Sequence, residues 1–308
     1  MTEMHEDAGG ARGGRRTGAG CLGLVLEGGG MRIAYSAGVL DAFMDHGVDI
    51  RYVIGVSAGA NAGSDYVSGH RERNHKVVVE MAADPRYAGP GNLLRERSWF
   101  GMRFLFETLP DRLAPFDYEA FRRSPRLLIV GVTDAETGAP VYFRHSDHDP
   151  RWFARNVLRA SSSLPVLSPP VLIHGRRYLD GGVSDSIPLA RSMAEGNRFN
   201  VVVLTRNAGF RKEAQRLGPI PRLLLSRYPE IVRALRERHT RYNASLELVE
   251  ARERAGEAFV FRPIRPLTVH RLERDVGKLE ALYRQGYDET VARLPELRRW
   301  MAAVGGAD

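Results

Sequence analysis

A serine between two glycines has the setting that most favours covalent chemistry in this chain. Gly55 and Gly59 flank Ser57 in a G-x-S-x-G pattern, between the apolar run Tyr52–Val56 and a helix-length segment. In a nucleophile elbow, a sharp turn between a strand and a helix exposes the serine hydroxyl, and the helix directs its positive end toward the reaction centre. The alternative is a serine that only caps the following helix.

A glycine-rich turn precedes this serine and offers backbone N–H groups to an anion. Its residues are Gly28, Gly29, Gly30, Met31 and Arg32. Glycines let a substrate approach the main chain closely, and N–H groups at the start of a helix can face an anion. A dinucleotide fingerprint fails because Ile33 occupies its third glycine position, and the Gly-Lys-Ser/Thr of a phosphate loop is absent. An oxyanion hole and a simple tight turn remain as interpretations.

An activated serine needs a base, and Asp180 is the candidate that a motif supports. It follows Tyr178-Leu179 at the end of a short apolar run and precedes Gly181 and Gly182. The alternative is an ordinary Asp-Gly turn. A carboxylate with a pKa of about 3.9 is a weak base. Burial that raises this pKa, together with a strong oxyanion site, would let it serve.

Three histidines late in the chain are the other candidate bases. They are His174, His239 and His270. An ordinary hydrolase triad follows the order serine, acid, histidine. His174 lies in an apparent hairpin turn and His239 among charged residues, and His270 has no loop signature around it. We therefore expect all three to be surface residues.

The three motifs, in this order, resemble the patatin-like phospholipase family of lipid acyl hydrolases over roughly residues 22–205. Further similarity lies in Arg159-Ala160-Ser161, Leu164-Pro165 and Ile187-Pro188, and the C-terminal part is similar to bacterial members. The resemblance implies a three-layer α/β/α fold and a Ser57–Asp180 dyad without histidine. It also implies an oxyanion hole from the N–H groups around Gly28–Gly30, helped by Arg32. Ile33 departs from the pattern, because many members carry glycine there.

The expected function is therefore that of a serine lipid acyl hydrolase of the phospholipase A, lysophospholipase or esterase type. Its partner would be a lipid ester: a phospholipid, a lysophospholipid or a neutral glyceride. No metal or other cofactor is expected, because no cluster of ligand residues accompanies the motifs. Two alternatives stay open. One is an acyltransferase on the same site, and the other is a non-enzymatic basic protein that binds a membrane surface or nucleic acid.

The elements that must position these residues are those of an α/β protein with a mainly parallel sheet. Short apolar runs alternate with helix-length segments, which is typical of such folds. The predicted strands are Leu22–Leu26, Tyr52–Val56, Leu127–Val132, Val141–Phe143, Val171–Ile173, Tyr178–Leu179, Val201–Leu204 and Phe259–Phe261. Helices are predicted from Ala34 to Met44, after Ser57, and from Pro150 to Ala160. The apolar stretch Trp99–Leu109 is either a buried helix or a lid over the site.

The predicted organisation is a disordered tail (1–20), a catalytic core (21–210) and a helical C-terminal extension (211–308) that packs on the core. Arg15-Arg16 before Cys21 would suit an export signal, but the apolar residues follow the cysteine instead of preceding it. A single cysteine favours a reducing compartment. No apolar run approaches the 18 or so residues of a membrane span. A cytoplasmic location is expected, with at most peripheral contact with a membrane.

The charge of the 308-residue chain is +8, with a pI of about 9.9, which suggests partners that carry phosphate. Residues 206–241 hold ten lysines and arginines but only three glutamates. No zinc finger, helix-turn-helix or RNA-binding signature accompanies them, so no nucleic acid is expected. A basic, partly apolar segment of this kind predicts peripheral docking on an anionic bilayer; the alternative is a solvated helix face.

Overall fold

A computed structural model describes residues 22–214 and 217–305 of the chain. The expected tail, with Cys21, lies outside the described residues. The described part contains an eight-stranded sheet. Its strands are β1 (Leu22–Leu26), β2 (Tyr52–Val56), β3 (Leu127–Asp134), β4 (Pro140–Arg144), β5 (Val171–Ile173), β6 (Arg176–Asp180), β7 (Phe199–Val203) and β8 (Ala258–Phe261).

The sheet is mainly parallel, as predicted, and its order is β5-β6-β3-β2-β1-β7-β8, with β4 also pairing β3. β3, β2, β1, β7 and β8 run parallel to their neighbours. The hairpin of β5 and β6 joins antiparallel, with Asp180 opposite Val132 of β3. Strand β8 comes from the C-terminal part, so that part contributes an edge strand to the central sheet.

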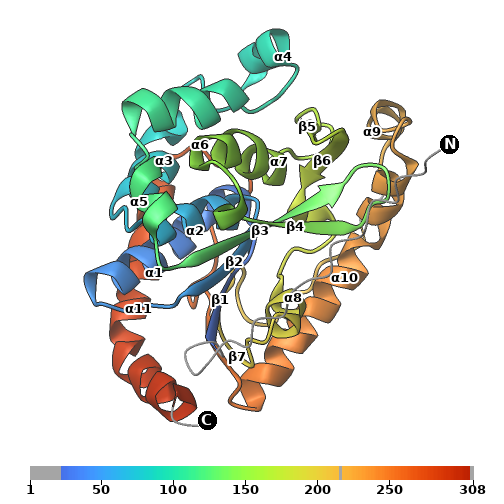
Figure 1. Cartoon of the computed structure of the whole chain (residues 1–308). Coiled ribbons are helices and arrows are strands. Elements are labelled where there is room, and N and C mark those ends of the chain that lie inside the picture. Colours follow the sequence, from blue (N-terminus) through green and yellow to red (C-terminus); the bar gives the residue numbers. More distant parts are fainter. Residues whose placement is uncertain (1–21, 215–216, 306–308) are drawn as a thin grey trace, which may run out of the picture.

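Helices cover both faces of the sheet, which gives the three layers expected (Figure 1). Short 3-10 or π-helical turns connect several of them. The helices are α1 (Ile33–Asp45), α2 (Ala58–Ser68), α3 (Arg73–Val78), α4 (Pro90–Glu96), α5 (Tyr118–Arg123), α6 (Pro150–Phe153), α7 (Arg159–Ser161), α8 (Leu189–Ala194), α9 (Pro219–Leu224), α10 (Pro229–Arg254) and α11 (Val276–Gly305).

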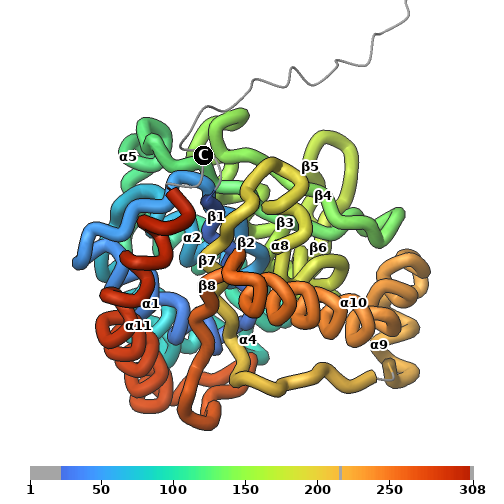
Figure 2. Tube along the Cα trace, turned by 90° about the horizontal axis from the view of Figure 1, so that it is seen from below, coloured from blue at the N-terminus to red at the C-terminus, as the bar shows by residue number. Residues whose placement is uncertain are grey.

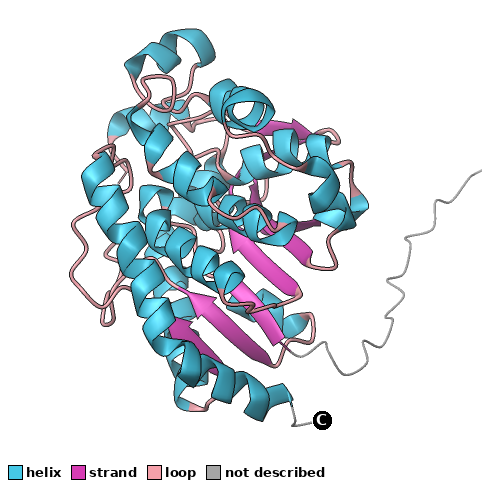
Figure 3. Ribbon diagram, turned by 90° about the vertical axis from the view of Figure 1, so that its left-hand side faces the viewer, coloured by secondary structure: helices cyan, strands magenta, loops and turns pink. Residues whose placement is uncertain are grey.

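The alternation of side chains along the buried strands builds the two halves of the core. Leu24 and Leu26 of β1 pack with residues of α1, α2 and α11, whereas Val25 packs with residues of α8 and α10. Successive side chains of a strand point to opposite faces, so a sheet covered on both sides needs apolar residues at every position. Figure 2 shows α1 and α11 on one side of the sheet and α10 on the other, and Figure 3 views the helices of the first side.

The C-terminal helix α11 lies against α1 at an unusually close approach. A Cβ on Gly38 of α1 would lie 2.1 Å from the carbonyl oxygen of Tyr283, and one on Gly286 of α11 would lie 2.1 Å from that of Tyr35. The two glycines therefore let the helix backbones meet directly. No helix among the described residues is long and apolar enough to cross a bilayer.

Candidate active site

Ser57 stands at the turn between β2 and α2 in a strained conformation. Its φ of 54° and ψ of −131° lie in a region that side chains other than glycine rarely adopt. A Cβ on Gly59 would lie 2.7 Å from the carbonyl oxygen of Glu27, and one on Gly55 would lie 2.9 Å from the amide nitrogen of Ala60. The two glycines of the motif therefore allow α2 to start tightly against β1 and β2.

Hydrogen bonds from outside the motif hold this turn. The Ser57 N–H donates to Ser161 Oγ at 2.7 Å, and the Ser161 hydroxyl donates to the carbonyl oxygen of Gly131 at 2.7 Å. Asn61, one helical turn after Ser57, donates from Nδ2 to the Ser57 carbonyl oxygen at 3.1 Å and to Ser162 Oγ at 2.8 Å. Neighbouring elements thus over-determine the strained backbone, the condition under which such strain persists.

Asp180 is the last residue of β6, and its carboxylate faces Ser57. The Ser57 hydroxyl donates to Asp180 Oδ2 at 2.6 Å, and the Gly182 N–H donates to Oδ1 at 2.7 Å. The Thr133 hydroxyl donates to the Asp180 carbonyl oxygen at 2.8 Å. Each carboxylate oxygen therefore has a donor, and the side chain is held in one orientation. His174, His239 and His270 form no hydrogen bond with Ser57 or Asp180 in the described structure.

The surroundings of Asp180 raise its pKa. Its exposed fraction is 2%, and this burial is the largest effect on the pKa. The hydrogen bond from Ser57, the charges of Arg271 and Arg238, and the Gly182 N–H act in the opposite direction without cancelling it. Burial disfavours the charged form of a carboxyl group. Asp180 is consequently a stronger base than an exposed aspartate.

The glycine loop lies beside the serine, and Glu27 anchors it. Glu27 accepts hydrogen bonds from the Tyr242 hydroxyl at 2.6 Å and from the Thr205 amide at 2.5 Å. A Cβ on Gly28 would lie 3.2 Å from the Cβ of Ser57, so the two motifs touch. The first glycine of the loop is therefore a neighbour of the serine across a sequence separation of almost thirty residues.

The amides of this loop are not equally available. Gly28 N–H donates to the Ser186 carbonyl oxygen at 3.2 Å, and Met31 N–H donates to that of Arg271 at 3.0 Å. The amides of Gly29 and Gly30 donate to no acceptor among the described residues. Gly30 has a φ of 57°, a value that favours glycine. Of the predicted set, Gly29 and Gly30 thus retain free N–H groups.

Arg32 follows the loop and is 6% exposed, with no partner for its Nε in the part of the chain that the structure describes. Burial, and next the charge of Arg206, lower its pKa to about 10, while Glu27 acts in the opposite sense. Arg32 lines none of the cavities described below. The structure thus brings its backbone, but not its guanidinium, to the edge of the Ser57 site.

An apolar cavity of about 130 Å³ opens next to Ser57. Gly30 and Ser57 lie at one part of its wall. Its apolar lining includes Val77, Val78, Phe100, Met102, Leu105, Phe106, Leu158 and Leu164. The helical segment Phe104–Leu113 has buried residues and also forms one side of this cavity. The apolar stretch Trp99–Leu109 therefore packs against the core and also forms a wall of the cavity. It has features of both the buried helix and the cover over the site that its sequence suggests.

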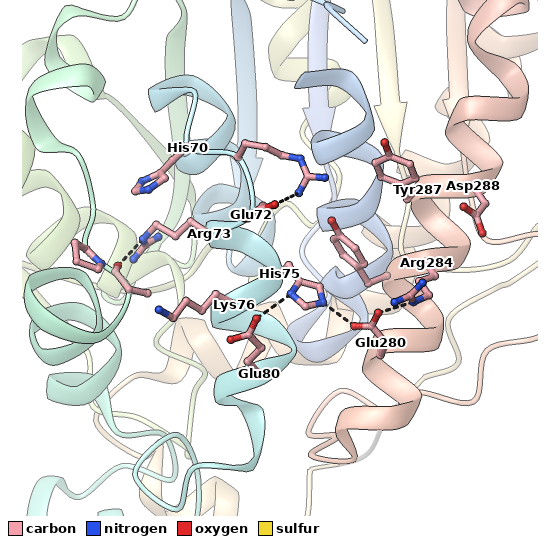
Figure 4. Close-up of a pocket in the computed structure, with 14 residues that line it drawn as sticks. His70, Glu72, Arg73, His75, Lys76, Glu80, Glu280, Arg284, Tyr287 and Asp288 are labelled. Carbon is pink, nitrogen blue, oxygen red and sulfur yellow. Dashed lines mark hydrogen bonds and ion pairs between the residues drawn. The ribbon is translucent and has the colours of Figure 1, made fainter. Parts of the chain in front are cut away.

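A larger cavity, of about 700 Å³, lies between α3 and α11 and contains no residue of the predicted site (Figure 4). His75 Nε2 lies 2.6 Å from Glu280 Oε2, and Arg284 Nε lies 2.5 Å from Glu280 Oε1. The described residues contain no group of three or more His, Cys, Asp or Glu side chains arranged to hold a metal ion. Titratable side chains of two helices therefore contact each other across this cavity.

Several residues of the site have no sequence motif of their own. Tyr242, Arg238 and Thr133 contact Glu27, Gly182 and Asp180 respectively. Arg238 and Tyr242 are four residues apart on α10, so they share one face of that helix. This spacing is the one feature of the sequence that places Arg238 and Tyr242 together. The neighbouring arginines obscure it, because they make this face of the helix resemble a solvent-exposed one.

The fold and the site together define a three-layer α/β protein with a nucleophile elbow. Residues 24–191, more than half of the chain, match the patatin-like phospholipase family, and the chain belongs to this family. Residues 228–302 match a domain of unknown function (DUF6363). Membership of the family supports a lipid hydrolase.

Relatives of this chain occur in bacteria and fungi. YjjU, an uncharacterized protein of Escherichia coli strain K12, is 29% identical over 191 residues, which are 60% of this chain and 52% of YjjU. Lysophospholipase NTE1 of Debaryomyces hansenii is 30% identical over 190 residues, which are 59% of this chain and 12% of that protein. The chain thus spans about half or less of the length of these curated relatives. The crystal structure of VipD from Legionella pneumophila aligns with 90% of this chain and 67% of VipD, with a TM-score of 0.49 and 15% identity.

Proposed function

We propose that this chain is a serine lipid acyl hydrolase in which Ser57 is the nucleophile and Asp180 the general base. The observation that carries the proposal is the 2.6 Å hydrogen bond from the Ser57 hydroxyl to a buried carboxylate, at a strained strand-to-helix turn. A nucleophile within hydrogen-bond reach of a base, which other groups hold in place, is the general arrangement for covalent catalysis. The raised pKa of Asp180 supports its role as the base.

In the proposed reaction, the Ser57 hydroxyl loses its proton to Asp180 as its oxygen attacks the ester carbonyl carbon. The free amides of Gly29 and Gly30 hold the oxyanion. When the intermediate collapses, Asp180 returns the proton to the leaving alcohol and an acyl-serine remains. Water then attacks the acyl-serine with Asp180 as base, which releases the fatty acid and restores the serine hydroxyl.

The cavity beside Ser57 supports a fatty acyl ester as the substrate. Its lining is mostly apolar, and Leu105, Phe106 and Leu158 are among the side chains that would contact an acyl chain. Burial of an acyl chain stabilises the complex by about 0.8 kcal/mol for each methylene that leaves water. Acyl transfer to an alcohol other than water would use the same nucleophile, base and cavity.

A fluorophosphonate probe tests the nucleophile. We expect the probe to label Ser57 of the purified protein, as located by peptide mass spectrometry, and Ser57→Ala to abolish both labelling and the hydrolysis of a short p-nitrophenyl ester. Ser146, in an exposed turn, gives the matched control Ser146→Ala, which should leave both unchanged. A protein that is not labelled and hydrolyses no ester would be a binding protein, and the proposal would fail.

The same proposal includes peripheral contact of residues 206–241 with an anionic bilayer. Ile220, Leu223 and Leu224 of α9 have exposed fractions of 70%, 74% and 60%. Arg222 and Arg227 beside them are exposed and form no ion pair with a described carboxylate. Apolar side chains among unpaired cations suit the interface of a membrane that carries anionic lipids.

Flotation with vesicles tests this docking. Binding to phosphatidylcholine vesicles that contain phosphatidylserine should fall steeply between 50 and 500 mM salt, because salt screens exposed charges. The double variant Leu223→Ser/Leu224→Ser should weaken binding. Ile264→Ser, at a side chain with an exposed fraction of 72% outside the segment, should not. Binding that salt does not change would contradict docking through this segment.

A further inference from the structure

Five basic side chains near the proposed catalytic pair form no ion pair with any carboxylate among the described residues. They are Arg32, Arg206, Lys212, Arg238 and Arg271. Other arginines of the same region are paired: Arg211 lies 2.8 Å from Glu250, and Arg241 lies 2.8 Å from Glu237. Arg222 and Arg227 are also unpaired, but they are exposed. The five cations therefore differ from the rest in lying unpaired close to Ser57 and Asp180.

Three of these cations share a cavity that adjoins the Ser57 cavity. Lys212, Arg238 and Arg271 line a space of about 120 Å³, and Leu164 lines both this space and the Ser57 cavity. Glu213 and His239 line the same space, and Glu213 forms no ion pair with the three cations in the described structure. Arg238 Nε donates to the carbonyl oxygen of Gly182, two residues after Asp180. Arg271 also contacts the glycine loop, since its carbonyl oxygen accepts the Met31 N–H. The cationic cavity is thus tied to both motifs of the site.

The cations of this cavity lower one another's pKa. Burial lowers the pKa of Lys212 to about 7, and the next largest effects come from Arg238 and Arg271. Burial, followed by the charge of Arg271, lowers the pKa of Arg238 to about 10. Like charges that are partly removed from water raise the free energy of the empty site, and an anion between them would reverse this effect. Guanidinium and ammonium groups form their strongest hydrogen bonds with carboxylate or phosphate.

We propose that Lys212, Arg238 and Arg271 form a subsite for the phosphate group of a phosphate-bearing lipid ester. This inference rests on the proposed function, because it places the phosphate relative to an ester bound at Ser57. In glycerol-based phospholipids the acyl ester and the phosphate are attached to one three-carbon unit, so they lie only a few bonds apart. An acyl chain in the Ser57 cavity therefore leaves the phosphate near the adjoining cationic cavity.

The subsite also gives the C-terminal part of the chain a role at the active site. Arg238 is on α10 and Arg271 lies between β8 and α11, so both fall within the residues that match a domain of unknown function. Lys212 lies between β7 and α9. The serine, the aspartate and the glycine loop all come from the region that matches the patatin-like family. The C-terminal part would thus select the substrate while the core performs the chemistry.

Two esters that differ only in a phosphate test the proposal: 1-palmitoylglycerol and 1-palmitoylglycerol 3-phosphate, in the same neutral detergent micelles. The measured quantity is the ratio of kcat/KM for the phosphate ester to kcat/KM for the neutral ester. We expect Lys212→Gln and Arg271→Gln each to lower this ratio about tenfold, because each removes a charged partner of the phosphate. Arg211→Gln, next to Lys212 but paired with Glu250, removes the same charge and should leave the ratio unchanged.

A binding measurement separates this subsite from the catalytic proposal. Calorimetric titration of inorganic phosphate into Ser57→Ala protein should show binding that Lys212→Gln weakens about tenfold and Arg211→Gln does not change. If the wild type hydrolyses neither ester but this pattern of phosphate binding holds, the proposed hydrolase fails and the anion site stands. If phosphate binds at Lys212 while the kcat/KM ratio stays constant, the ligand is free phosphate, and the assignment to a lipid headgroup is overturned. Equal ratios for all variants without phosphate binding overturn the subsite itself.

Discussion

Two charged cavities of this molecule differ in how their charges are balanced. In the cavity between α3 and α11, His75 lies between Glu80 and Glu280, at 3.3 and 2.6 Å, and Arg284 also contacts Glu280 (Figure 4). In the cavity that adjoins the Ser57 cavity, Lys212 and Arg271 form no ion pair with a described carboxylate. The first cavity has a volume of about 700 Å³ and the second about 120 Å³, so size does not indicate which one acts on a ligand.

The difference indicates where a ligand is needed. Opposite charges that face each other on a protein surface satisfy one another and contribute little to stability. Like charges that share a partly buried space are unfavourable until a counter-ion arrives. The groups in the cavity between α3 and α11 are therefore already partnered by contacts within and between the two helices. The cavity of Lys212 and Arg271 is arranged to receive an anion.

The largest difference in activity is expected between two carboxylate-to-amide variants, one at the proposed catalytic pair and one in the cavity between α3 and α11. Asp180→Asn should lower kcat for a p-nitrophenyl ester by about 10²- to 10⁴-fold, because an amide cannot accept the serine proton. Glu280→Gln makes the same change in the cavity between α3 and α11, away from Ser57, and should leave kcat within a factor of two. Initial rates at pH 8, with folding checked by circular dichroism, measure both.

The pH profile of the wild type sharpens this prediction. Because burial raises the pKa of Asp180, its active, ionised form is lost at a higher pH than for an exposed aspartate. Activity should therefore rise with pH through the raised pKa and then level off. Retained activity in Asp180→Asn, with loss of activity in His239→Ala or His270→Ala, would replace the proposed dyad with a serine–histidine mechanism.

The motifs of the site could be predicted from the sequence because each is local. Ser57 lies between an apolar run and a helix-length segment, and Asp180 ends an apolar run, so each signal fits within a short window. Most strands of the sheet were likewise marked by apolar runs, including β8 at its far edge. The contact between Ser57 and Asp180 was expected from a family resemblance and not from spacing. This contact depends on the antiparallel register that sets Asp180 opposite Val132, which no local pattern encodes.

The roles of the supporting residues could not be predicted, because they depend on contacts between distant segments. Ser161 belongs to a segment that resembles the family, but its contact with the Ser57 amide spans 104 positions, and the contact of Tyr242 with Glu27 spans 215. Arg238 lies in an arginine-rich sequence that resembles a solvated helix face, yet its guanidinium contacts Gly182. The charge of residues 206–241 therefore divides into paired arginines, exposed arginines around α9 and cations that face the site, a division that composition alone does not contain.

A smaller effect is expected in the chemical reactivity of the three lysines of the chain, Lys76, Lys212 and Lys278. Acylating reagents attack the unprotonated amine. Because its pKa is lowered to about 7, Lys212 is unprotonated at neutral pH far more often than an ordinary lysine, so it should be acylated several-fold faster than Lys76, which lines the other cavity. Its rate should rise with pH around a midpoint of about 7. Peptide mass spectrometry over short reaction times measures all three rates.

Inorganic phosphate provides the control for this reaction. A bound anion favours the protonated amine and shields it, so phosphate should slow the acylation of Lys212 and leave that of Lys76 and Lys278 unchanged. Chloride at matched ionic strength should slow Lys212 much less. If Lys212 reacts no faster than Lys278, which lies 3.7 Å from Glu273, the lysine of the cationic cavity is an ordinary surface amine.

The smallest effect is expected from the ion pairs of Glu280 in the cavity between α3 and α11. Partial burial alone would raise the pKa of Glu280, but the hydrogen bonds with His75 and Arg284 outweigh it and lower the pKa. A lowered pKa in the folded state stabilises the fold above the pKa of the unfolded chain, and this stabilisation is lost as the pH falls through the folded value. Because the groups are partly exposed, Glu280→Gln should cost under about 1 kcal/mol at pH 7 and nothing near pH 3.

Urea denaturation of both proteins at the two pH values measures this difference. Asp288→Asn, two turns further along α11 in the same cavity, is the matched control, because Asp288 forms no ion pair with a described residue and should give no change. A cost of more than about 3 kcal/mol for Glu280→Gln would exceed what partly exposed ion pairs contribute. It would mean that the charges between α3 and α11 are held in a dry, tightly coupled network, and the contrast with the cavity of Lys212 would then lie in burial and not only in pairing.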